Sequence, residues 1–488
     1  MEEGERANPN PSPSPNPNTF TVDDALLTLG FGKYQYFVLA YAALAWISEA
    51  MEMMLLSFIG PVVQRLWHLS AKEQSLITSV VFIGMLVGAY SWGVIADKYG
   101  RRKGFLMTAM VTTLAGFASA FSPNYASLLV FRCVVGIGLG GGPVLCSWLL
   151  EFIPPPNRGT WMVVFQAFWT VGTVFEASIA WIVMPRLGWR WLLAFSSIPS
   201  FGLLLFYLWT PESPRYLCLN GREKEAMVIL ERISKVNGTK VPLGTLVCDD
   251  YQEGLDGDAA PTKKSKQGPF STILNLLSRE LIRPTLLLWV VFFGNSFTYY
   301  GLVLLTTELN AGRSRCAGNK TESKKAEDVD YKDVFITTFA EFPGLIIVAV
   351  TVDRVGRRIS MAVLFFICCI LIFPLLFNQT AKVTTGLLFG SRVCITATFT
   401  TLFIYAPEIY PTAVRSTGFG SASSMGRIGG MICPYVAVAL VQHCHQTAAI
   451  GMFEAIIFLS GVSVLLIPIE TKGRDLSDNV NSKNPPPV

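Results

Sequence analysis

The chain has 488 residues, of which 51% are hydrophobic and 15% are charged, whereas soluble domains carry about 25% charged residues. This composition excludes an ordinary soluble protein and indicates an integral membrane protein. The net charge of +5 is small, so nothing in the charge balance predicts a nucleic-acid partner.

The chain begins with a segment rich in Pro, Asn and Ser, which we expect to be a disordered cytosolic tail and not a signal peptide. Thr21, followed by Asp23 and Asp24, is a helix N-cap signal. It predicts a short amphipathic helix ahead of the first membrane span.

Twelve apolar segments follow, each long enough or nearly long enough to cross a bilayer, which takes roughly 20 residues. They lie near residues 36–60, 75–93, 104–121, 126–149, 161–184, 191–209, 284–305, 334–352, 359–377, 385–405, 412–441 and 448–468. We therefore predict an all-α membrane protein. Its expected parts are a tail at 1–20, a six-helix bundle at 21–210, a partly helical cytosolic loop at 211–282, a second six-helix bundle at 283–470 and a cytosolic tail at 471–488.

Basic residues in two short loops predict the orientation. Lys98 to Lys103 follow the second span, and Arg354 to Arg358 follow the eighth. Because cytosolic loops are enriched in Lys and Arg, both loops are expected to be cytosolic. An even number of spans then places both termini in the cytosol. Cys218 and Cys248 of the central loop are expected to be cytosolic and reduced.

The two halves of the chain resemble each other. The stretch ADKYGRRK has its counterpart in VDRVGRRI, with Asp97 and Asp353 256 positions apart. EFIPPPNRG and EIYPTAVRS form a second pair, with Glu151 and Glu408 257 positions apart. Parallel six-span repeats are typical of carriers built from two bundles.

The first span carries two carboxylates, Glu49 and Glu52, which share one face of a helix. A carboxylate inside a span normally faces a partner, a cavity or a proton path. Arg132 of the fourth span is a candidate counter-charge for either one. We expect Glu52 to couple proton binding to transport. The alternatives are that its ion pair only stabilises the fold, or that Arg132 extends to a membrane face.

Several motifs carry a family resemblance. GVIADKYGRRK at 93–103, PESPRYL at 211–217, PEIYPTAVRS at 407–416 and PIETKGR at 468–474 resemble signatures of the major facilitator superfamily. SEAMEMMLLSF, GGPVLCSWLLEFIP and YAPEIYPTAVRSTG resemble a plant group described both as organic cation/carnitine transporters and as nicotinate transporters. That group is similar to the synaptic vesicle 2-related proteins of animals. The resemblance implies two six-helix bundles around a central site.

The resemblance implies a cytosolic gate of charged side chains that breaks when the carrier opens inward; the alternative is a static topology anchor. Its members here are Asp97, Arg101, Arg102, Glu151, Arg158, Asp353, Arg357, Arg358, Glu408 and Arg415. Glu49 and Glu52 stand at the spacing of the acidic pair of aromatic acid:proton symporters. We also assign Arg132 and Glu176 to proton coupling.

The resemblance also implies a central substrate site lined by aromatic residues. Trp169, Tyr299 and Tyr300 are the candidates, with simple helix packing as the alternative, and Asn295 and Gln166 offer polar contacts. Arg427 suits a substrate carboxylate, because a guanidinium pairs with it through two hydrogen bonds. A cationic substrate would depend on Glu341 or Glu176 instead, and a zwitterion could use both charges.

Two modifications are expected on the exoplasmic side. Cys316 and Cys444 are candidates for a disulfide bond, and Asn319 heads a glycosylation sequence. We predict no metal site, although His443 and His445 flank Cys444. No nucleophile–base pair or phosphate-binding loop indicates an enzyme.

We therefore predict a secondary active transporter that moves nicotinate or a related pyridine carboxylate, such as its N-methyl form, together with protons. The alternatives are a carnitine or organic cation transporter, and a non-transporting receptor or trafficking protein. We expect a cofactor-free monomer in the plasma membrane, with the vacuolar membrane as the alternative.

Overall fold

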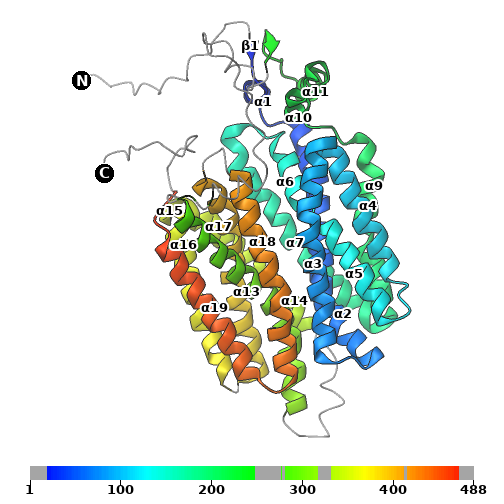
Figure 1. Ribbon diagram of the computed structural model, residues 1–488, viewed down its shortest axis with the longest axis vertical. Coiled ribbons are helices and arrows are strands. Elements are labelled where there is room, and N and C mark those ends of the chain that lie inside the picture. Colours follow the sequence, from blue (N-terminus) through cyan, green and yellow to red (C-terminus); the bar gives the residue numbers. More distant parts are fainter. Residues whose placement is uncertain are drawn as a thin grey trace, which may run out of the picture.

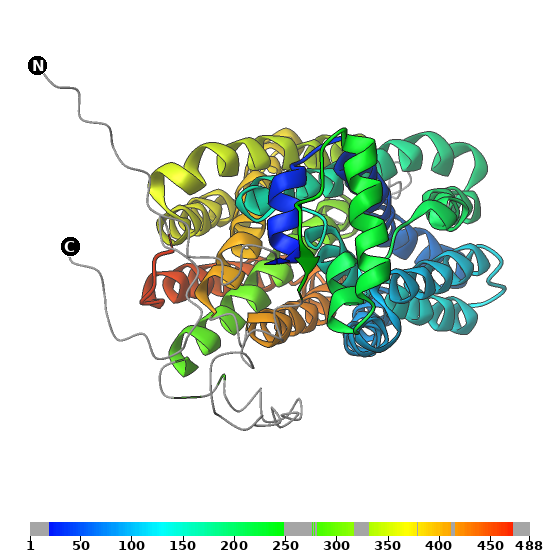
Figure 2. The same ribbon diagram turned by 90° about the horizontal axis from the view of Figure 1, so that it is seen from above.

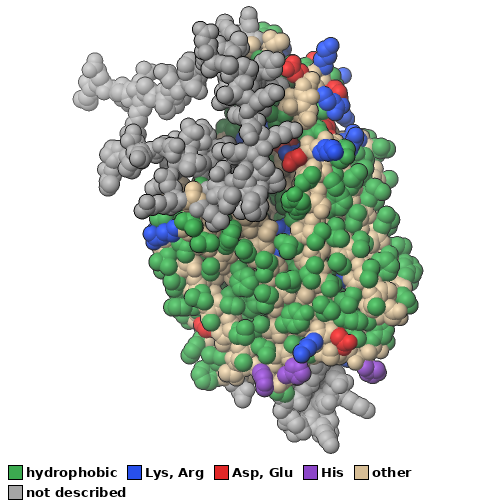
Figure 3. All heavy atoms as spheres, in the orientation of Figure 1, with side chains coloured by type: hydrophobic (Ala, Val, Ile, Leu, Met, Phe, Trp, Pro, Cys, Tyr) green, Lys and Arg blue, Asp and Glu red, His purple; other side chains and the backbone are tan. Residues whose placement is uncertain are grey.

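The computed structural model describes residues 19–247, 276, 278, 281–316, 331–377, 379–410 and 415–471. Helices dominate these residues, and the two halves of the chain form two bundles side by side (Figure 1). On the face seen in Figure 3, hydrophobic side chains cover the middle of the molecule, whereas charged and His side chains gather toward its two ends. This distribution suits a protein that crosses a membrane.

The six spans of the N-terminal bundle are α2 (Lys33–Trp67), α3 (Ala71–Tyr99), α4 (Arg101–Ser119), α5 with α6 (Tyr125–Leu139, Gly142–Leu150), α7 (Arg158–Leu187) and α8 with α9 (Trp189–Ser196, Ile198–Phe206). Those of the C-terminal bundle are α13 (Ile282–Cys316), α14 with α15 (Tyr331–Phe339, Glu341–Val355), α16 (Arg357–Ile372), α17 (Ala381–Ile409), α18 with the π-helical η6 (Arg415–Pro434, Tyr435–Leu440) and α19 (Gln446–Leu466). Short 3₁₀ turns lie at Pro155–Asn157, Tyr207–Trp209 and Phe373–Leu376. The twelve predicted spans are confirmed.

Ten of these spans are long and apolar enough to cross a membrane by length and composition alone. The other two are α4 and α18 with η6. Three basic residues open α4, and α18 is rich in Gly and Ser. Their neighbours in the bundles identify both as spans: α4 packs on α5, and α18 packs on α13 and α3.

Proline interrupts two of the spans near their middle. Pro143 lies four residues after Leu139, the last residue of α5, and Pro343 lies four residues after Phe339, the last residue of α14. Proline has no N–H to bond the carbonyl four residues earlier, so each helix ends at that point. The second interruption places Glu341 in the first turn of α15, where a helix N-terminus favours a negative charge.

One end of the molecule carries a small cap built from segments outside the bundles. It contains β1 (Thr19–Phe20), α1 (Val22–Leu29), α10 (Pro214–Leu219), α11 (Glu223–Asn237) and β2 (Thr245–Leu246). Figure 2 looks down on this end, with the blue α1 and the green α11 in front of the spans. We call it the basic end, because Arg101, Arg102, Arg357 and Arg358 lie there at the starts of α4 and α16.

The cap confirms one prediction and corrects two. Thr21 accepts a hydrogen bond from the backbone N–H of Asp24, and the Asp24 side chain bonds back to Thr21, so the predicted helix start is confirmed. The boundary of the predicted disordered tail was wrong by two residues, because Thr19–Phe20 pairs in parallel with Thr245–Leu246. Cys218, expected to be reduced, is disulfide-bonded.

The main contacts between the two bundles come from two helix groups. α3 of the first bundle packs on α18 and η6 of the second, and α7 packs on α14 and α15. Each bundle has its own large apolar core. Two smaller apolar clusters contain residues of both bundles, and the polar residues of the site lie close to this interface.

Candidate substrate and coupling site

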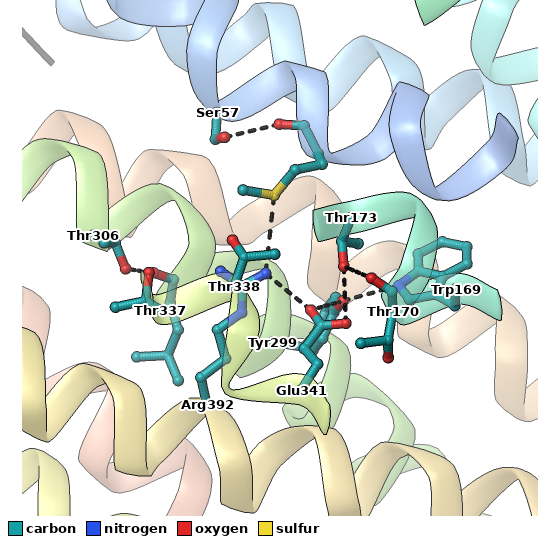
Figure 4. A network of polar contacts seen from close by, with 12 residues as sticks. Ser57, Trp169, Thr170, Thr173, Tyr299, Thr306, Thr337, Thr338, Glu341 and Arg392 are labelled. Carbon is teal, nitrogen blue, oxygen red and sulfur yellow. Dashed lines mark hydrogen bonds and ion pairs between the residues drawn. The ribbon is translucent and has the colours of Figure 1, made fainter. Parts of the chain in front are cut away.

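A network of polar side chains joins the two bundles at the centre of the molecule (Figure 4). Arg392 of α17 and Glu341 of α15 form an ion pair at 2.9 Å, and their side chains are 1% and 0% exposed. The Tyr299 hydroxyl of α13 donates a hydrogen bond to the same carboxylate at 2.7 Å. Glu341, predicted to bind substrate, is thus held by two donors of its own bundle.

Two residues of α7 extend this network across the bundle interface. The Thr173 hydroxyl lies 3.1 Å from the second oxygen of Glu341 and 3.0 Å from the carbonyl of Thr170. The Trp169 indole N–H donates to the Tyr299 hydroxyl at 2.9 Å. Trp169 and Tyr299, both predicted from the sequence, are therefore direct neighbours from different bundles.

The N-terminal bundle contains a second buried ion pair. Glu52 of α2 and Arg132 of α5 lie 2.9 Å apart, with side chains 1% and 0% exposed. Ser119 accepts a further hydrogen bond from Arg132 at 2.5 Å. Arg132 is enclosed and does not extend to a membrane face. The structure thus brings together the two residues that the sequence suggested as partners.

Glu176 of α7 is fully buried but takes no part in that ion pair. Both of its oxygens lie within 2.9 Å of the Ser196 hydroxyl of α8. The same hydroxyl also lies 2.7 Å from the Leu192 carbonyl, so its single proton has three possible acceptors. Glu176 therefore lacks a cationic partner at ion-pair distance among the described residues.

Glu49 and Arg427 are half-buried and have no ion-pair partner among the described residues. A Cβ atom at Gly142 would lie 3.2 Å from a Glu49 oxygen and 3.3 Å from the Trp46 ring, so both side chains lie near Gly142. Arg427 donates one hydrogen bond, to Ser423 at 3.2 Å, while its buried Nε atom bonds no described residue.

Aromatic rings border the same interface. Trp46 lies 5.1 Å from Trp169 between ring centroids, and Tyr300 lies 4.8 Å from Phe82. Gln166 accepts a hydrogen bond from Trp46 at 3.0 Å, and so supports the ring. Asn295 accepts one from Thr398 at 3.1 Å, and its buried amide nitrogen bonds no described residue.

At the basic end, the two halves repeat one arrangement. Gly100 and Gly356 precede α4 and α16 with φ of 111° and 107°. The Glu212 carboxylate accepts the backbone N–H of Arg102 at 3.0 Å, and the Glu470 carboxylate accepts that of Arg358, its counterpart, at 3.2 Å. Positive φ suits glycine, and a Cβ at Gly100 would lie 2.4 Å from Glu212.

The predicted gate residues form ion pairs within each bundle. Arg101 pairs with Asp97 and, at 3.3 Å, with Glu151. Burial raises the pKa of the Glu151 carboxyl above its ordinary value, while nearby Arg101 acts in the opposite direction. In the other half, Arg357 lies 3.3 Å from Glu408.

Three other gate residues contact groups outside the predicted gate. Arg158 pairs with Asp23 of α1 at 2.8 Å. Arg102 contacts the Tyr207 carbonyl and ring, and Arg358 bonds the Leu465 carbonyl. The side chains of Asp353 and Arg415 lie outside the described residues.

The opposite end of the molecule joins the two bundles through amides. We call it the glutamine end. Gln442, which follows η6, forms hydrogen bonds with Gln64 at 2.7 Å and Gln74 at 2.6 Å, both from the N-terminal bundle. It also donates to Glu308 of α13 at 3.0 Å, and Gln74 donates to Glu308 at 2.7 Å.

The predicted modifications fall partly outside the described residues. Cys444 is disulfide-bonded, but the side chain of Cys316, its expected partner, is not described, and neither is Asn319. The pairing therefore stays a prediction.

Sequence reasoning missed Arg392, Glu212, Glu470 and the glutamine end. Arg392 had a usable signal, because it lies 260 positions after Arg132, close to the spacing of the internal repeat. Glu212 and Glu470 stand in the PESPRYL and PIETKGR motifs, 258 positions apart. The four residues of the glutamine end follow no pattern that the sequence reveals.

Two six-helix bundles, each with a buried ion pair of its own, define a transporter of the major facilitator class. The family model for sugar (and other) transporters matches residues 34–480, and the chain belongs to this family. It is 60% identical to organic cation/carnitine transporter 7 of Arabidopsis thaliana, over 96% of this chain and 98% of that protein.

More distant proteins agree with this assignment. The chain is 38% identical to the synaptic vesicle 2-related protein of Xenopus laevis, over 94% of this chain and 83% of that protein. Its fold matches the partially occluded, inward-open xylose transporter XylE of E. coli with a TM-score of 0.69. That match has 15% identity and covers 91% of this chain and 100% of XylE.

Proposed function

We propose that the protein is a proton-coupled transporter of nicotinate or a related pyridine carboxylate, including the N-methyl form, which works by alternating access. The observation that carries this proposal is Arg427, a half-buried guanidinium with a buried donor free of described partners. A guanidinium binds a carboxylate through two charge-assisted hydrogen bonds. The rings of Trp46, Trp169 and Tyr300 offer faces on which a pyridine ring could stack.

The inventory of charges at the centre supports the uptake of a proton. Four carboxyl groups lie there, those of Glu49, Glu52, Glu176 and Glu341, against the three guanidinium groups of Arg132, Arg392 and Arg427. Unpaired charge is unfavourable in a low-dielectric interior. One carboxyl is therefore the natural site for a proton, and we assign this role to the Glu52, Arg132 and Glu176 group.

We place the basic end in the cytosol, because its short loops carry Lys and Arg, and we expect the plasma membrane, with the vacuolar membrane as the alternative. The bundles are bonded together at the glutamine end, while Arg101 and Arg357 form ion pairs within their own bundles. This arrangement supports an inward-facing state.

The experiment that tests the proposal is uptake into proteoliposomes. Labelled nicotinate and labelled carnitine are offered in parallel, with and without an inward proton gradient, to wild type and to Arg427→Gln. We expect gradient-driven nicotinate uptake in wild type and its loss in the variant. Absence of nicotinate uptake by folded wild-type protein would refute the substrate assignment.

A second candidate is transport of carnitine or another organic cation. The Arabidopsis relative bears that name, and Glu49 offers a half-buried carboxylate near Trp46. An ammonium group would bind such a carboxylate and interact with the aromatic face. Carnitine uptake that depends on Glu49 and exceeds nicotinate uptake would favour this candidate.

A further inference from the structure

The two buried ion pairs have different surroundings, although their distances and burial are alike. Glu52 bonds Arg132 within the N-terminal bundle, and its second oxygen has no described hydrogen-bond partner. Glu341 instead accepts from Arg392 and Tyr299 on one oxygen and from Thr173 on the other. Thr173 belongs to the other bundle, so the bonds of Glu341 cross the interface.

From this difference we propose that Glu341 is a second proton-binding site, in the C-terminal bundle, and that its protonation loosens the contact between the bundles. The inference rests on the proposed alternating-access function, and it adds a site that couples proton binding to movement. A ligand shifts a conformational equilibrium only if it interacts differently with the two states. Glu341 meets this requirement because its partners lie on both bundles.

The Thr173 hydroxyl changes its hydrogen-bond acceptor when Glu341 gains a proton. Its hydroxyl has one proton and two acceptors, the Thr170 carbonyl at 3.0 Å and the Glu341 carboxylate at 3.1 Å. An ionised carboxylate is the stronger acceptor, because hydrogen bonds to charged groups are roughly twice as strong. When Glu341 gains a proton, the Thr173 hydroxyl turns to the carbonyl of its own helix, a bond that Thr makes readily.

Tyr299 links the same change to Trp169. The Tyr299 hydroxyl donates to Glu341 and accepts from the Trp169 indole, so a weaker bond to Glu341 also weakens this second hydrogen bond from α7 to the C-terminal bundle. The Arg392 guanidinium lies near the Tyr299 ring, 6.0 Å from its centroid, and 3.9 Å from Met54 Sδ on α2. Both bridges between α7 and the C-terminal bundle therefore depend on the charge of one carboxyl group.

Few other titratable groups face Glu341. Arg392 lies on α17, and Tyr299 and Tyr300 lie on α13. α7 presents Thr173 and Trp169, which do not titrate, while its Glu176 faces Ser196. On α16, Cys368 bonds the Ser391 carbonyl and Cys369 interacts with Glu454 of α19. Glu341 is thus the carboxyl in this group whose proton affects the interface.

The test measures the separation of the bundles and needs no substrate. Spin labels are placed at Lys98→Cys and Ile359→Cys, two exposed positions at the basic end of different bundles. Wild-type protein labelled in the same way gives the background from native cysteines. The protein that carries only the two introduced cysteines is the reference. Distances between the labels are recorded in lipid nanodiscs between pH 5 and pH 8 for this reference and for the same protein with Glu341→Gln, Thr173→Val or Glu52→Gln added.

We expect a pH-dependent distance distribution in the reference protein. Glu341→Gln should give the acid-pH distribution at every pH, and Thr173→Val should reduce the response at least threefold. Glu52→Gln should retain the response. Thr173→Val keeps both ion pairs, so it tests the role of the bond between Thr173 and Glu341 even if Glu341→Gln does not fold. Glu341→Gln with Arg392→Gln, which removes the whole pair, should also be pH-independent.

The proposal is overturned if the reference protein shows no pH response, if Thr173→Val responds like the reference, or if only Glu52→Gln removes the response. These outcomes are separate from the substrate assignment. A protein that transports neither nicotinate nor carnitine, yet shows the Glu341-dependent shift, contradicts the proposed substrate alone.

Discussion

Arg132 and Arg392, 260 positions apart in the repeated halves of the chain, are each buried against a glutamate at 2.9 Å. Breaking a buried ion pair by removing one partner leaves an uncompensated charge, which destabilises a protein by about 3–5 kcal/mol. Replacing both partners by apolar residues of similar size removes that penalty. The two pairs can therefore be tested for stability and for transport independently.

For the N-terminal pair, Glu52→Gln should lower the melting temperature, because Arg132 then lacks its counter-charge. The double variant Glu52→Met with Arg132→Met should recover most of that stability without recovering gradient-driven uptake. The measurement is thermal melting of purified protein together with uptake in proteoliposomes. Recovery of gradient-driven uptake in the double variant would show that the pair only stabilises the fold.

For substrate binding, Arg427→Gln should raise the KM for nicotinate. A hydrogen bond to a charged group contributes about 1.5–3 kcal/mol, which corresponds to a change of roughly 10- to 150-fold. Ser423→Ala is the matched control, since it removes only the acceptor that Arg427 bonds within its own helix. An unchanged KM in Arg427→Gln would exclude this residue from the carboxylate site.

The start of α4 needs glycine for two reasons. At Gly100, φ is 111° and a Cβ would lie 2.4 Å from the Glu212 carboxylate. Gly100→Ala should therefore lower the melting temperature, because a backbone conformation that is essentially restricted to glycine costs other residues about 1–3 kcal/mol. Gly93→Ala, in α3 with open space around its Cβ position, is the control and should not lower it. Equal melting temperatures for both variants would contradict the requirement.

At the glutamine end, Gln442→Leu should weaken the junction between the bundles. It removes the bonds to Gln64, Gln74 and Glu308 and leaves the buried Glu308 with one donor fewer. We expect a larger share of molecules open at this end, measured as faster labelling of a cysteine introduced at Gln64. The same cysteine in a Gln442 background provides the reference rate. An unchanged rate would mean that these amides do not hold the end closed.

Glu151 makes stability depend on pH. Its pKa is raised in the folded protein, so its stabilising contribution is present at acid pH and is lost as pH rises through the raised pKa. The neutral variant Glu151→Gln avoids burying a charge. Its melting temperature should match that of wild type at acid pH and exceed it at neutral pH. A variant that is less stable at neutral pH would show that the Arg101 ion pair outweighs burial.

Local signals in the sequence proved easy to interpret. Thr21 and Asp24 form the expected helix start because a capping box needs only residues three apart. Glu52 and Arg132 were suggested as partners because a charge inside an apolar span needs a counter-charge. Arg392 could have been predicted as the counterpart of Arg132 only by comparing the two halves of the chain beyond their two repeated motifs.

Contacts between distant helices were not predictable in the same way. Gln64, Gln74 and Gln442 are ordinary polar residues near the ends of spans, and only the packing of the two bundles brings their amides together. The partners of Arg158 and Arg102 likewise depend on the cap, whose α1 supplies Asp23, and on the end of the sixth span, which supplies the Tyr207 carbonyl.

The central claim is that substrate and protons move together, and the most direct measurement is proton flux driven by substrate. Proteoliposomes that enclose a pH indicator are placed in a solution that contains nicotinate, at the same pH inside and outside. We predict acidification of the interior in wild type, none in Glu52→Gln, and none in protein-free vesicles after the permeation of the neutral acid is subtracted. Nicotinate uptake by wild type without accompanying proton entry would contradict the account.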